Sequence, residues 1–262
     1  MRQKLRISEK IYMFLVFAFL YAPIVVLIVF SFNESKSRGQ WTNFSLKWYV
    51  ELFNDREIMR SVTTTFIVAI IATVVSTVIG TMAAVGLMEY KAGRRRILLG
   101  LNQVPVLNPD IVTAVGLMVL YKFANIGLGW LTLIISHIVF TIPYVILSIL
   151  PKLKMMDKNL SEAAMDLGAT ELQTLTKVII PEIKGGILTG AIMAFTMSID
   201  DFVISFFTTG HGVTTISTTV YSMARKGINP SINALSTIMF GLTLILLVIV
   251  YIKTNEEERI RA

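Results

Sequence analysis

The sequence predicts an all-α, polytopic membrane protein with six transmembrane helices and a cytoplasmic two-helix loop. The first observation behind this prediction is composition: 54% of the 262 residues are hydrophobic and only 16% are charged, whereas a typical soluble domain has about 25% charged residues. The second is that the apolar residues lie in long blocks. A helix needs about 20 such residues to cross a hydrocarbon layer roughly 30 Å thick.

Six apolar segments match that length, and a helix satisfies the backbone hydrogen bonds of each. They are Ile11–Phe32, Ser61–Met88, Ile97–Tyr121, Gly129–Leu150, Gly185–Thr209 and Leu235–Ile252. The first follows a basic N-terminus, as in a signal peptide, but it is long and lacks a small-residue cleavage site, so an uncleaved span is expected. Pro105 and Pro109 interrupt the third, which predicts a broken helix. Residues 1–262 are expected to form one transmembrane domain.

The positions of Lys and Arg predict that both termini lie in the cytoplasm. Alternate connections, counted from the N-terminal segment, hold 16 of the 24 basic residues. Cytoplasmic connections of membrane proteins carry such an excess. This orientation signal explains the net charge of +7 without nucleic acid as a partner. Cysteine is absent, which excludes disulfides and thiolate metal sites, and neither a metal nor a cofactor is expected.

The first outer loop, residues 33–60, is expected to contain a short helix at the membrane interface. Ser45 is a plausible N-cap, and Tyr49 and Phe53 then fall on one helical face. Tryptophan is enriched at membrane–water interfaces. Trp48 is therefore interpreted first as an interface anchor and second as a contact for a transported molecule.

The longest inner connection, residues 151–184, predicts two short helices joined by a glycine. Asn159 and Glu162 have the spacing of a capping box, so a helix is expected to begin near Leu160. Gly168 is placed to end that helix in a left-handed conformation.

A second capping box predicts another short helix directly after this glycine. It consists of Thr170 and Gln173, and Pro181 is expected to stop the helix because the residue before a proline disfavours the α region. On the first helix, Ala163 and Ala164 keep one side slim enough to enter a partner's groove. The alternative is a hairpin that only covers the inner face of the bundle.

This loop carries a family resemblance. The run Glu162-Ala163-Ala164-x-x-x-Gly168, followed by Ile180-Pro181, resembles the EAA loop of ABC importer permeases. The resemblance extends along nearly the whole chain and is closest to the smaller permease subunit of bacterial spermidine/putrescine importers. It implies a multi-pass protein of the bacterial inner membrane. It also implies that the loop couples the chain to an ATPase through the following residues: Glu162, Ala163, Ala164, Gly168 and Glu171.

The resemblance further implies the partners of the chain. They are a second, related permease, two copies of a cytoplasmic ABC ATPase, an extracytoplasmic polyamine-binding protein and the polyamine itself. The sequence contains no GxxxxGK[ST] phosphate loop, so ATP hydrolysis is assigned to another polypeptide and the chain is not expected to be an enzyme. Related permeases import ferric iron, a phosphonate or thiamine, and these cargoes remain the alternative.

Four residues are candidate contacts for a cationic cargo: Asp200, Asp201, Asp110 and Trp48. Carboxylates accept charge-assisted hydrogen bonds from ammonium groups. A carboxylate within a span costs about 2.5–3.5 kcal/mol on insertion scales, which favours a functional role. The alternative is that the aspartates bind the N–H groups of helix ends, and Asp110 is also placed to cap a half-helix.

Two further features of the spans have structural interpretations. His137 lies inside the fourth span, where an interhelical hydrogen bond is favoured over a proton relay. Gly186 and Gly190 have the GxxxG spacing that is typical of close helix packing.

Overall fold

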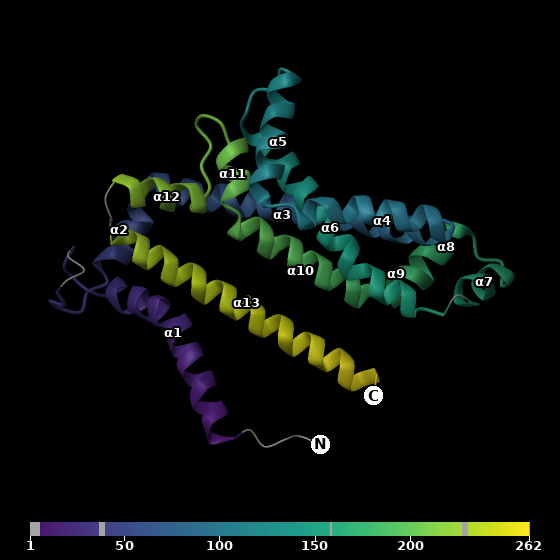
Figure 1. Cartoon of the computed structure of the whole chain (residues 1–262), viewed down its shortest axis with the longest axis horizontal. Helices are drawn as coiled ribbons and strands as arrows, with labels where there is room; N and C mark the ends of the chain where they lie inside the picture. The colour runs from purple at the N-terminus through teal and green to yellow at the C-terminus, as the bar shows by residue number, and fades with distance from the viewer. Residues whose placement is uncertain (1–5, 37–39, 158, 227–229, 262) are drawn as a thin grey trace. The chain divides into compact units, whose positions relative to one another are not determined.

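The computed structural model describes residues 6–36, 40–157, 159–226 and 230–261 (Figure 1). These residues form helices, and within them the one β pairing is a bridge between Asn33 and Phe44. The predicted all-α fold is therefore confirmed. The chain forms two compact units, one from Met1–Met59 with Val220–Ala262 and one from Arg60–Thr219; they are called the first and the second unit below.

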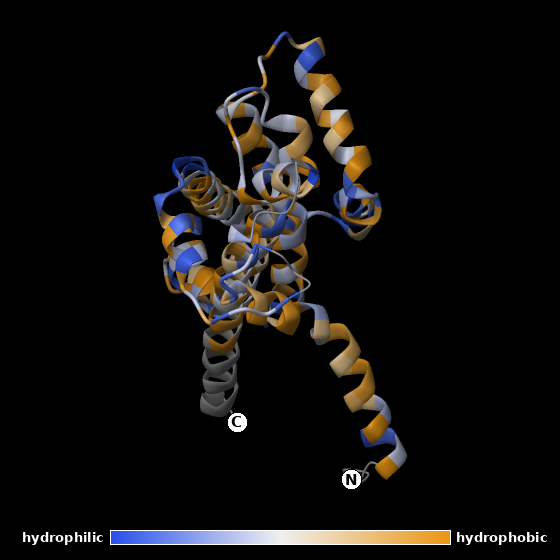
Figure 2. Ribbon diagram, turned by 90° about the vertical axis from the view of Figure 1, so that its left-hand side faces the viewer, coloured by the Kyte–Doolittle hydropathy of each residue, from blue (hydrophilic) through white to orange (hydrophobic). Residues whose placement is uncertain are grey.

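The first unit brings the two ends of the chain together. Its helices are α1 (Ile7–Ser31), α2 (Lys47–Asn54) and α13 (Ser231–Arg261), and α3 (Arg56–Glu89) and α12 (Ile216–Lys226) each belong in part to both units. Helix α13 contacts both α1 and α2. Along α1 the one buried residue is Ser31, and Figure 2 shows how hydrophobic this helix is. So much exposed apolar surface is expected of a helix in lipid or against another subunit.

The short helix predicted in the first outer loop is confirmed as α2. It begins after Leu46, one residue later than the expected N-cap, while the Ser45 Oγ accepts a hydrogen bond from the Lys47 N–H at 3.1 Å. Its Trp48 side chain is buried rather than held at a surface.

The second unit is built around one central helix. Its long helices are α3, α4 (Ala92–Leu107), α5 (Asp110–Phe123), α6 (Trp130–Met155) and α10 (Lys184–Asp200), followed by the short α11 (Val203–Thr208). Helix α6 contacts α4, α5, α10 and α11. Its buried side chains Val145 and Ile149 form a core cluster with Ala84 of α3 and Ala194 of α10. This helix therefore positions the elements of the site.

Close packing at the predicted GxxxG pair is confirmed. A Cβ atom on Gly190 would lie 3.2 Å from the Cα of Val145, and one on Gly186 would lie 3.2 Å from the Cα of Ile149. Both glycines are buried. Because they have no side chain, α10 approaches the backbone of α6 directly.

Three helices are long and apolar enough to cross a membrane, namely α1, α3 and α6. Two bent pairs reach that length together: α4 with α5, bent by 101°, and the segment Glu171–Glu182 with α10, bent by 72°. The predicted break of the third apolar segment is thus confirmed. The sixth segment, Leu235–Ile252, lies in α13, where most side chains beyond position 245 lie outside the described residues, and the count of six spans stays a prediction.

Candidate functional site

A buried polar cluster lies where α6 meets the end of α10. The His137 Nδ1 lies 2.7 Å from the Ser198 Oγ, and the Nε2 lies 3.1 Å from the Ser205 Oγ and 3.5 Å from the Asp201 Oδ2. The His137 side chain is 1% exposed and that of Asp201 is 4% exposed. The predicted interhelical hydrogen bonds of His137 are confirmed, and they join α6, α10 and α11.

The two adjacent aspartates have different environments. The Asp201 carboxylate accepts hydrogen bonds from the backbone N–H groups of Ile204 at 3.0 Å and Ser205 at 2.7 Å. It thereby caps α11, which is the alternative that the sequence left open. Asp200 is the last residue of α10 and is exposed.

The expected single helix over Gly185–Thr209 is wrong. The chain leaves the helical conformation at Asp201, which has φ −67° and ψ 129°, and α11 begins at Val203. The physical reason is the cap: the carboxylate takes the place of the preceding turn for the first N–H groups of α11.

Aromatic rings follow the aspartate pair. Phe202 and Phe206 have ring centroids 5.4 Å apart, and Phe206 and Phe207 have centroids 5.3 Å apart in an edge-on arrangement. Phe206 is exposed. The exposed Asp200 carboxylate and the exposed Phe206 ring are thus six residues apart in the chain. Both kinds of group attract an alkylammonium group.

Asp110 lies at the bend between α4 and α5. Pro109 holds the N-cap position without a side-chain bond, and Asp110 is the exposed first residue of α5. Its carboxylate places negative charge at the helix N-terminus, which is favourable there. Ala114 of the same helix forms a core cluster with Phe140 of α6 and Ile204 of α11, and Met197 of α10 packs against that cluster. Two of the predicted carboxylates therefore belong to helices that share one core.

Trp48 belongs to the first unit and has a structural role there. Its side chain is 0% exposed, and its indole N–H donates to the Asn33 carbonyl oxygen at 2.6 Å. The sequence predicts a ring anchored at the membrane surface, but in the structure the ring is buried. It is buried because the segment that carries Asn33 and Phe44 packs against α2.

Several buried hydroxyls of this region were not predicted from the sequence. The Thr132 Oγ1 donates to the Thr208 carbonyl oxygen at 2.8 Å, and the Tyr121 hydroxyl lies 2.8 Å from the Ser136 Oγ. The sequence did contain a signal for these hydroxyls. Thr132 and Ser136 are four residues apart, as are His137 and Thr141, and residues at that spacing lie on the same face of a helix. Within the described part of the chain, no group of three or more His, Cys, Asp or Glu side chains is placed to hold a metal ion.

The glycine turn predicted within residues 151–184 is confirmed. Helix α7 (Asn159–Asp166) is followed by a turn at Gly168, which has φ +86°. The Gly168 N–H donates to the Met165 carbonyl at 2.9 Å and the Ala169 N–H donates to the Ala164 carbonyl at 3.0 Å, which is the Schellman pattern. At the start of the helix, the Asp157 Oδ1 accepts from the Asn159 N–H at 3.0 Å, so Asn159 is the first helical residue rather than the cap.

The second capping box is also confirmed, but the stop at Pro181 is wrong. Thr170 and Gln173 exchange side-chain and backbone hydrogen bonds of 3.3 and 3.0 Å. The helical path then continues through α8 (Glu171–Thr174), the π-helical turn η1 (Leu175–Ile179) and α9 (Ile180–Glu182), and bends only at Ile183. The wider π turn tolerates a proline, which lacks the N–H of the regular pattern.

We name residues 159–174 the docking segment, and it leaves large apolar side chains in the open. Leu167 is 90% exposed and Leu172 is 69% exposed, and α7 has no buried residue. Glu162 and Glu171 are also exposed. A hairpin that only covered the bundle would bury its apolar stripe. Exposed leucines beside carboxylates indicate a surface for another protein.

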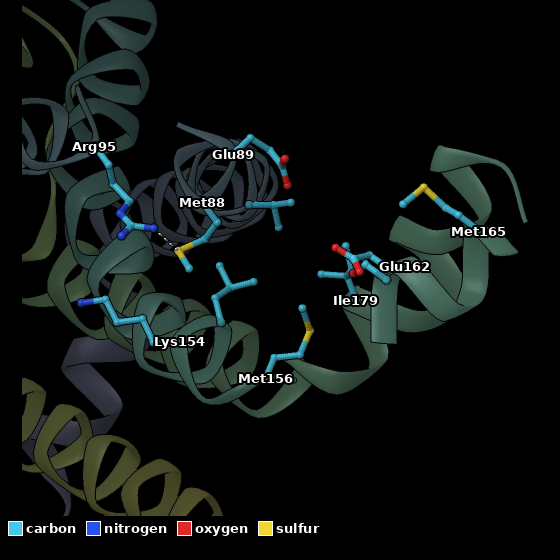
Figure 3. A pocket seen from close by; sticks show the side chains of 11 residues that line it. Met88, Glu89, Arg95, Lys154, Met156, Glu162, Met165 and Ile179 are labelled. Atoms are coloured by element: carbon cyan, nitrogen blue, oxygen red, sulfur yellow. Dashed lines mark hydrogen bonds between the residues drawn. The ribbon is translucent and has the colours of Figure 1, made fainter. Parts of the chain in front are cut away.

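A cavity of about 540 Å³ separates part of the docking segment from the helix bundle. Its wall includes Arg95 of α4 and Lys154 of α6 on one side and Glu162 and Met165 of α7 on the other (Figure 3). Helix α7 therefore stands away from the bundle at this point, as a protruding element does.

Comparison with known proteins identifies the family. Residues 76–253 match the family described as "Binding-protein-dependent transport system inner membrane component". The chain belongs to this family. The predicted ABC permease class is thereby confirmed, as is its place in a membrane.

Relatives in this family resemble the chain along most of its length. The spermidine/putrescine transport system permease protein PotC of Escherichia coli (strain K12) is 36% identical over 237 residues, which cover 90% of each chain. PotC of Haemophilus influenzae (strain ATCC 51907 / DSM 11121 / KW20 / Rd) is 34% identical over 94% of this chain and 95% of its own length. The putrescine transport system permease protein PotI of Escherichia coli (strain K12) is 38% identical over 86% of this chain and 83% of its own length.

Solved structures share the fold of this ABC permease. A chain of a bacterial ABC transporter involved in the import of the acidic polysaccharide alginate matches with a TM-score of 0.72 and 17% identity, over 96% of this chain and 94% of that one. A chain of an amino acid ABC transporter with histidines matches with a TM-score of 0.53 and 20% identity, over 78% of this chain and 94% of that one.

Proposed function

We propose that this permease is one of two related membrane subunits of an ATP-driven importer of polyamines, spermidine or putrescine. The observation that supports the cargo most strongly is that relatives named as spermidine/putrescine or putrescine permeases are 34–38% identical over most of the chain. The alginate and amino acid transporters share the fold at 17–20% identity, so their cargoes do not transfer.

The docking segment is the contact with the ATPase. The Schellman turn at Gly168 ends α7, and the capping box that follows begins α8; together they fix the angle between the two helices. Leu167 and Leu172 supply exposed apolar anchors, and Glu162 and Glu171 supply charges at their rim. With both termini in the cytoplasm, this segment lies on the side of the membrane where the two copies of a cytoplasmic ABC ATPase bind, and an extracytoplasmic polyamine-binding protein delivers the cargo on the other side.

The cargo contacts differ among the predicted carboxylates. Asp200 is exposed and lies close in the chain to the exposed ring of Phe206, so it is the residue that accepts a hydrogen bond from an ammonium group. Asp110, also exposed, provides a second acceptor for the other end of a polyamine. Asp201 acts as a positioning residue, because its oxygens are already engaged by α11 and approached by His137.

Other cargoes of related permeases fit the described residues less well. A phosphonate is an anion and needs basic groups in its path, whereas the start of α5 and the end of α10 each present an exposed carboxylate, Asp110 and Asp200. Ferric iron or thiamine would be distinguished by the ligand of the cognate binding protein.

The experiment is reconstitution of the chain with its partner permease, ATPase and binding protein in proteoliposomes. ATP-dependent uptake of radiolabelled spermidine and putrescine is expected. Asp200→Asn should lower uptake at limiting cargo about tenfold or more, because it removes the negative charge and leaves the ammonium group only a neutral amide oxygen as acceptor. Glu57→Gln, which changes an exposed carboxylate at the start of α3, is the matched control and should leave uptake unchanged.

Two results would contradict the proposal in different ways. The first is that neither polyamine is taken up while a binding protein that carries another ligand stimulates the ATPase. That result would refute the proposed cargo and leave the permease class intact. Unaltered uptake in Asp200→Asn would refute the carboxylate mechanism.

A further inference from the structure

One buried side chain joins the two sides of the break between α10 and α11. The His137 Nδ1 of α6 lies 2.7 Å from the Ser198 Oγ, in the last turn of α10, and the Nε2 lies 3.1 Å from the Ser205 Oγ of α11. All three side chains are buried. A single ring therefore holds the end of one helix and the start of the next against α6.

The backbone at the break does not by itself set the angle between α10 and α11. Asp201 is extended there, with φ −67° and ψ 129°, so regular helical geometry is interrupted. Phe140 of α6 and Ile204 of α11 belong to an apolar cluster on which Met197 of α10 packs, but apolar contact has no preferred direction. Hydrogen bonds do prefer a direction. The two bonds of His137 therefore add the directional constraint at the break.

These two bonds also bear on the exposed groups that follow each serine. Ser198 and Asp200 are two residues apart, which places them on roughly opposite sides of α10, and Ser198 is buried while Asp200 is exposed. On α11, Ser205 is buried and the next residue, Phe206, is exposed. The bond that holds each serine thus also sets the position of an exposed group one or two residues further along the chain.

The far end of α11 is fixed to α6 by a separate bond. The Thr132 Oγ1 donates to the carbonyl oxygen of Thr208, the last residue of α11, at 2.8 Å. Helix α6 thus holds α11 near its start and at its end, and the His137 bonds are those nearer to Asp200 in the chain. Loss of these bonds should loosen the start of α11 while the Thr132 bond keeps the helix in place.

We propose that His137 is a positioning residue for the cargo, because it fixes the place of the Asp200 carboxylate relative to the Phe206 ring. An ammonium group forms a charge-assisted hydrogen bond at about 2.7–2.9 Å and interacts with an aromatic ring within about 6 Å of its centroid. Both contacts depend on where the two helix ends lie. If the break were free to bend, cargo binding would also have to order it, which lowers affinity. The cargo role of Asp200 rests on the proposed function.

The test is spermidine uptake by the reconstituted importer over a range of cargo concentrations. The same binding protein serves every variant, so a change in KM arises from the permease. His137→Ala should raise KM about three- to tenfold, up to the effect of losing the Asp200 hydrogen bond itself. His137→Gln should recover part of this loss, because its amide keeps an acceptor and a donor.

Two serine variants form a matched pair that disturbs the fold less. Ser205→Ala removes one buried hydroxyl on the α11 side of the break and should raise KM about two- to threefold. Ser136→Ala removes a buried hydroxyl of α6 that lies 2.8 Å from the Tyr121 hydroxyl instead, and it should leave KM unchanged. A double-mutant cycle links the ring to the carboxylate: His137→Ala should raise the KM of the Asp200→Asn importer by much less than that of the unaltered importer.

Three results would overturn the proposal. A lower maximal rate with an unchanged KM in His137→Ala and Ser205→Ala would show that the cluster only maintains the fold. An equal rise of KM in Ser136→Ala would show a general effect of lost buried hydroxyls. The same factor with and without Asp200→Asn would show that the ring does not act through the carboxylate. If the unaltered importer takes up neither polyamine, the proposed cargo fails as well, and that result is distinct from normal uptake with an unchanged KM in the variants.

Discussion

Replacement of Gly168 by alanine tests the docking segment with little other disturbance. Gly168 has φ +86°, and a Cβ atom at this position would meet nothing within 4 Å. The cost is therefore conformational, about 1–2 kcal/mol for a non-glycine residue in the left-handed region. If only the native turn docks, that cost lowers the fraction of docking-competent molecules by a factor of about 5–30.

The assay is the ATPase rate of the reconstituted importer at increasing ATPase subunit concentration. Gly168→Ala should raise the concentration for half-maximal coupled activity by that factor, and Gly168→Asn should recover part of the loss because asparagine tolerates this conformation. Gly212→Ala is the matched control, since Gly212 has φ +84° and open space around its Cβ position but lies outside the docking segment. Equal loss in the two alanine variants, or normal docking of Gly168→Ala, would refute the reasoning.

Three more predictions concern the second unit, each measured as thermal unfolding of the purified chain. Gly210→Ala should lower the free energy of unfolding by about 1–3 kcal/mol, because Gly210 has φ +65° and a Cβ atom there would lie 2.4 Å from a backbone oxygen. Gly127→Ala is the control and should cost far less, since a Cβ atom there would meet nothing within 4 Å. Similar losses of stability in the two variants would contradict the close packing at Gly210. Asp201→Ala should cost about 0.5–2 kcal/mol through the lost cap of α11, whereas Asp200→Ala should be nearly neutral; the reverse order would argue against the assigned roles. His137→Ala should cost about 1–3 kcal/mol, since it leaves buried polar partners unpaired, and an unchanged unfolding temperature would disprove the cluster's structural role.

The connection over residues 151–184 was the most predictable part of the chain because its signals are local. A capping box needs two residues three positions apart, and a helix-ending glycine needs only its own freedom of φ. The turn at Gly168 and the box at Thr170 and Gln173 were therefore read correctly. The stop predicted at Pro181 is wrong because a local rule was applied to it as well. That rule holds for a regular α-helix before the proline, whereas residues Leu175–Ile179 form a π-helical turn.

The environment of each aspartate was less predictable because it depends on distant residues. The cap by Asp201 splits the fifth apolar segment, and hydropathy does not detect such a break when the flanking residues stay apolar. The partners of His137 come from two other elements, and the burial of Trp48 depends on a turn around Asn33. Sequence patterns indicate which side chains are candidates for a site, but tertiary packing determines whether these side chains are buried or exposed.

The most direct test of the account is photo-crosslinking from position 167 in the assembled importer. Leu167 is the most exposed large apolar residue of the docking segment, so a photoreactive amino acid placed there should capture the ATPase subunit. The same group at Val50, an exposed apolar residue of α2, should not. Failure of position 167 to capture the ATPase, or equal capture from position 50, would contradict the claim that this segment couples the permease to ATP hydrolysis.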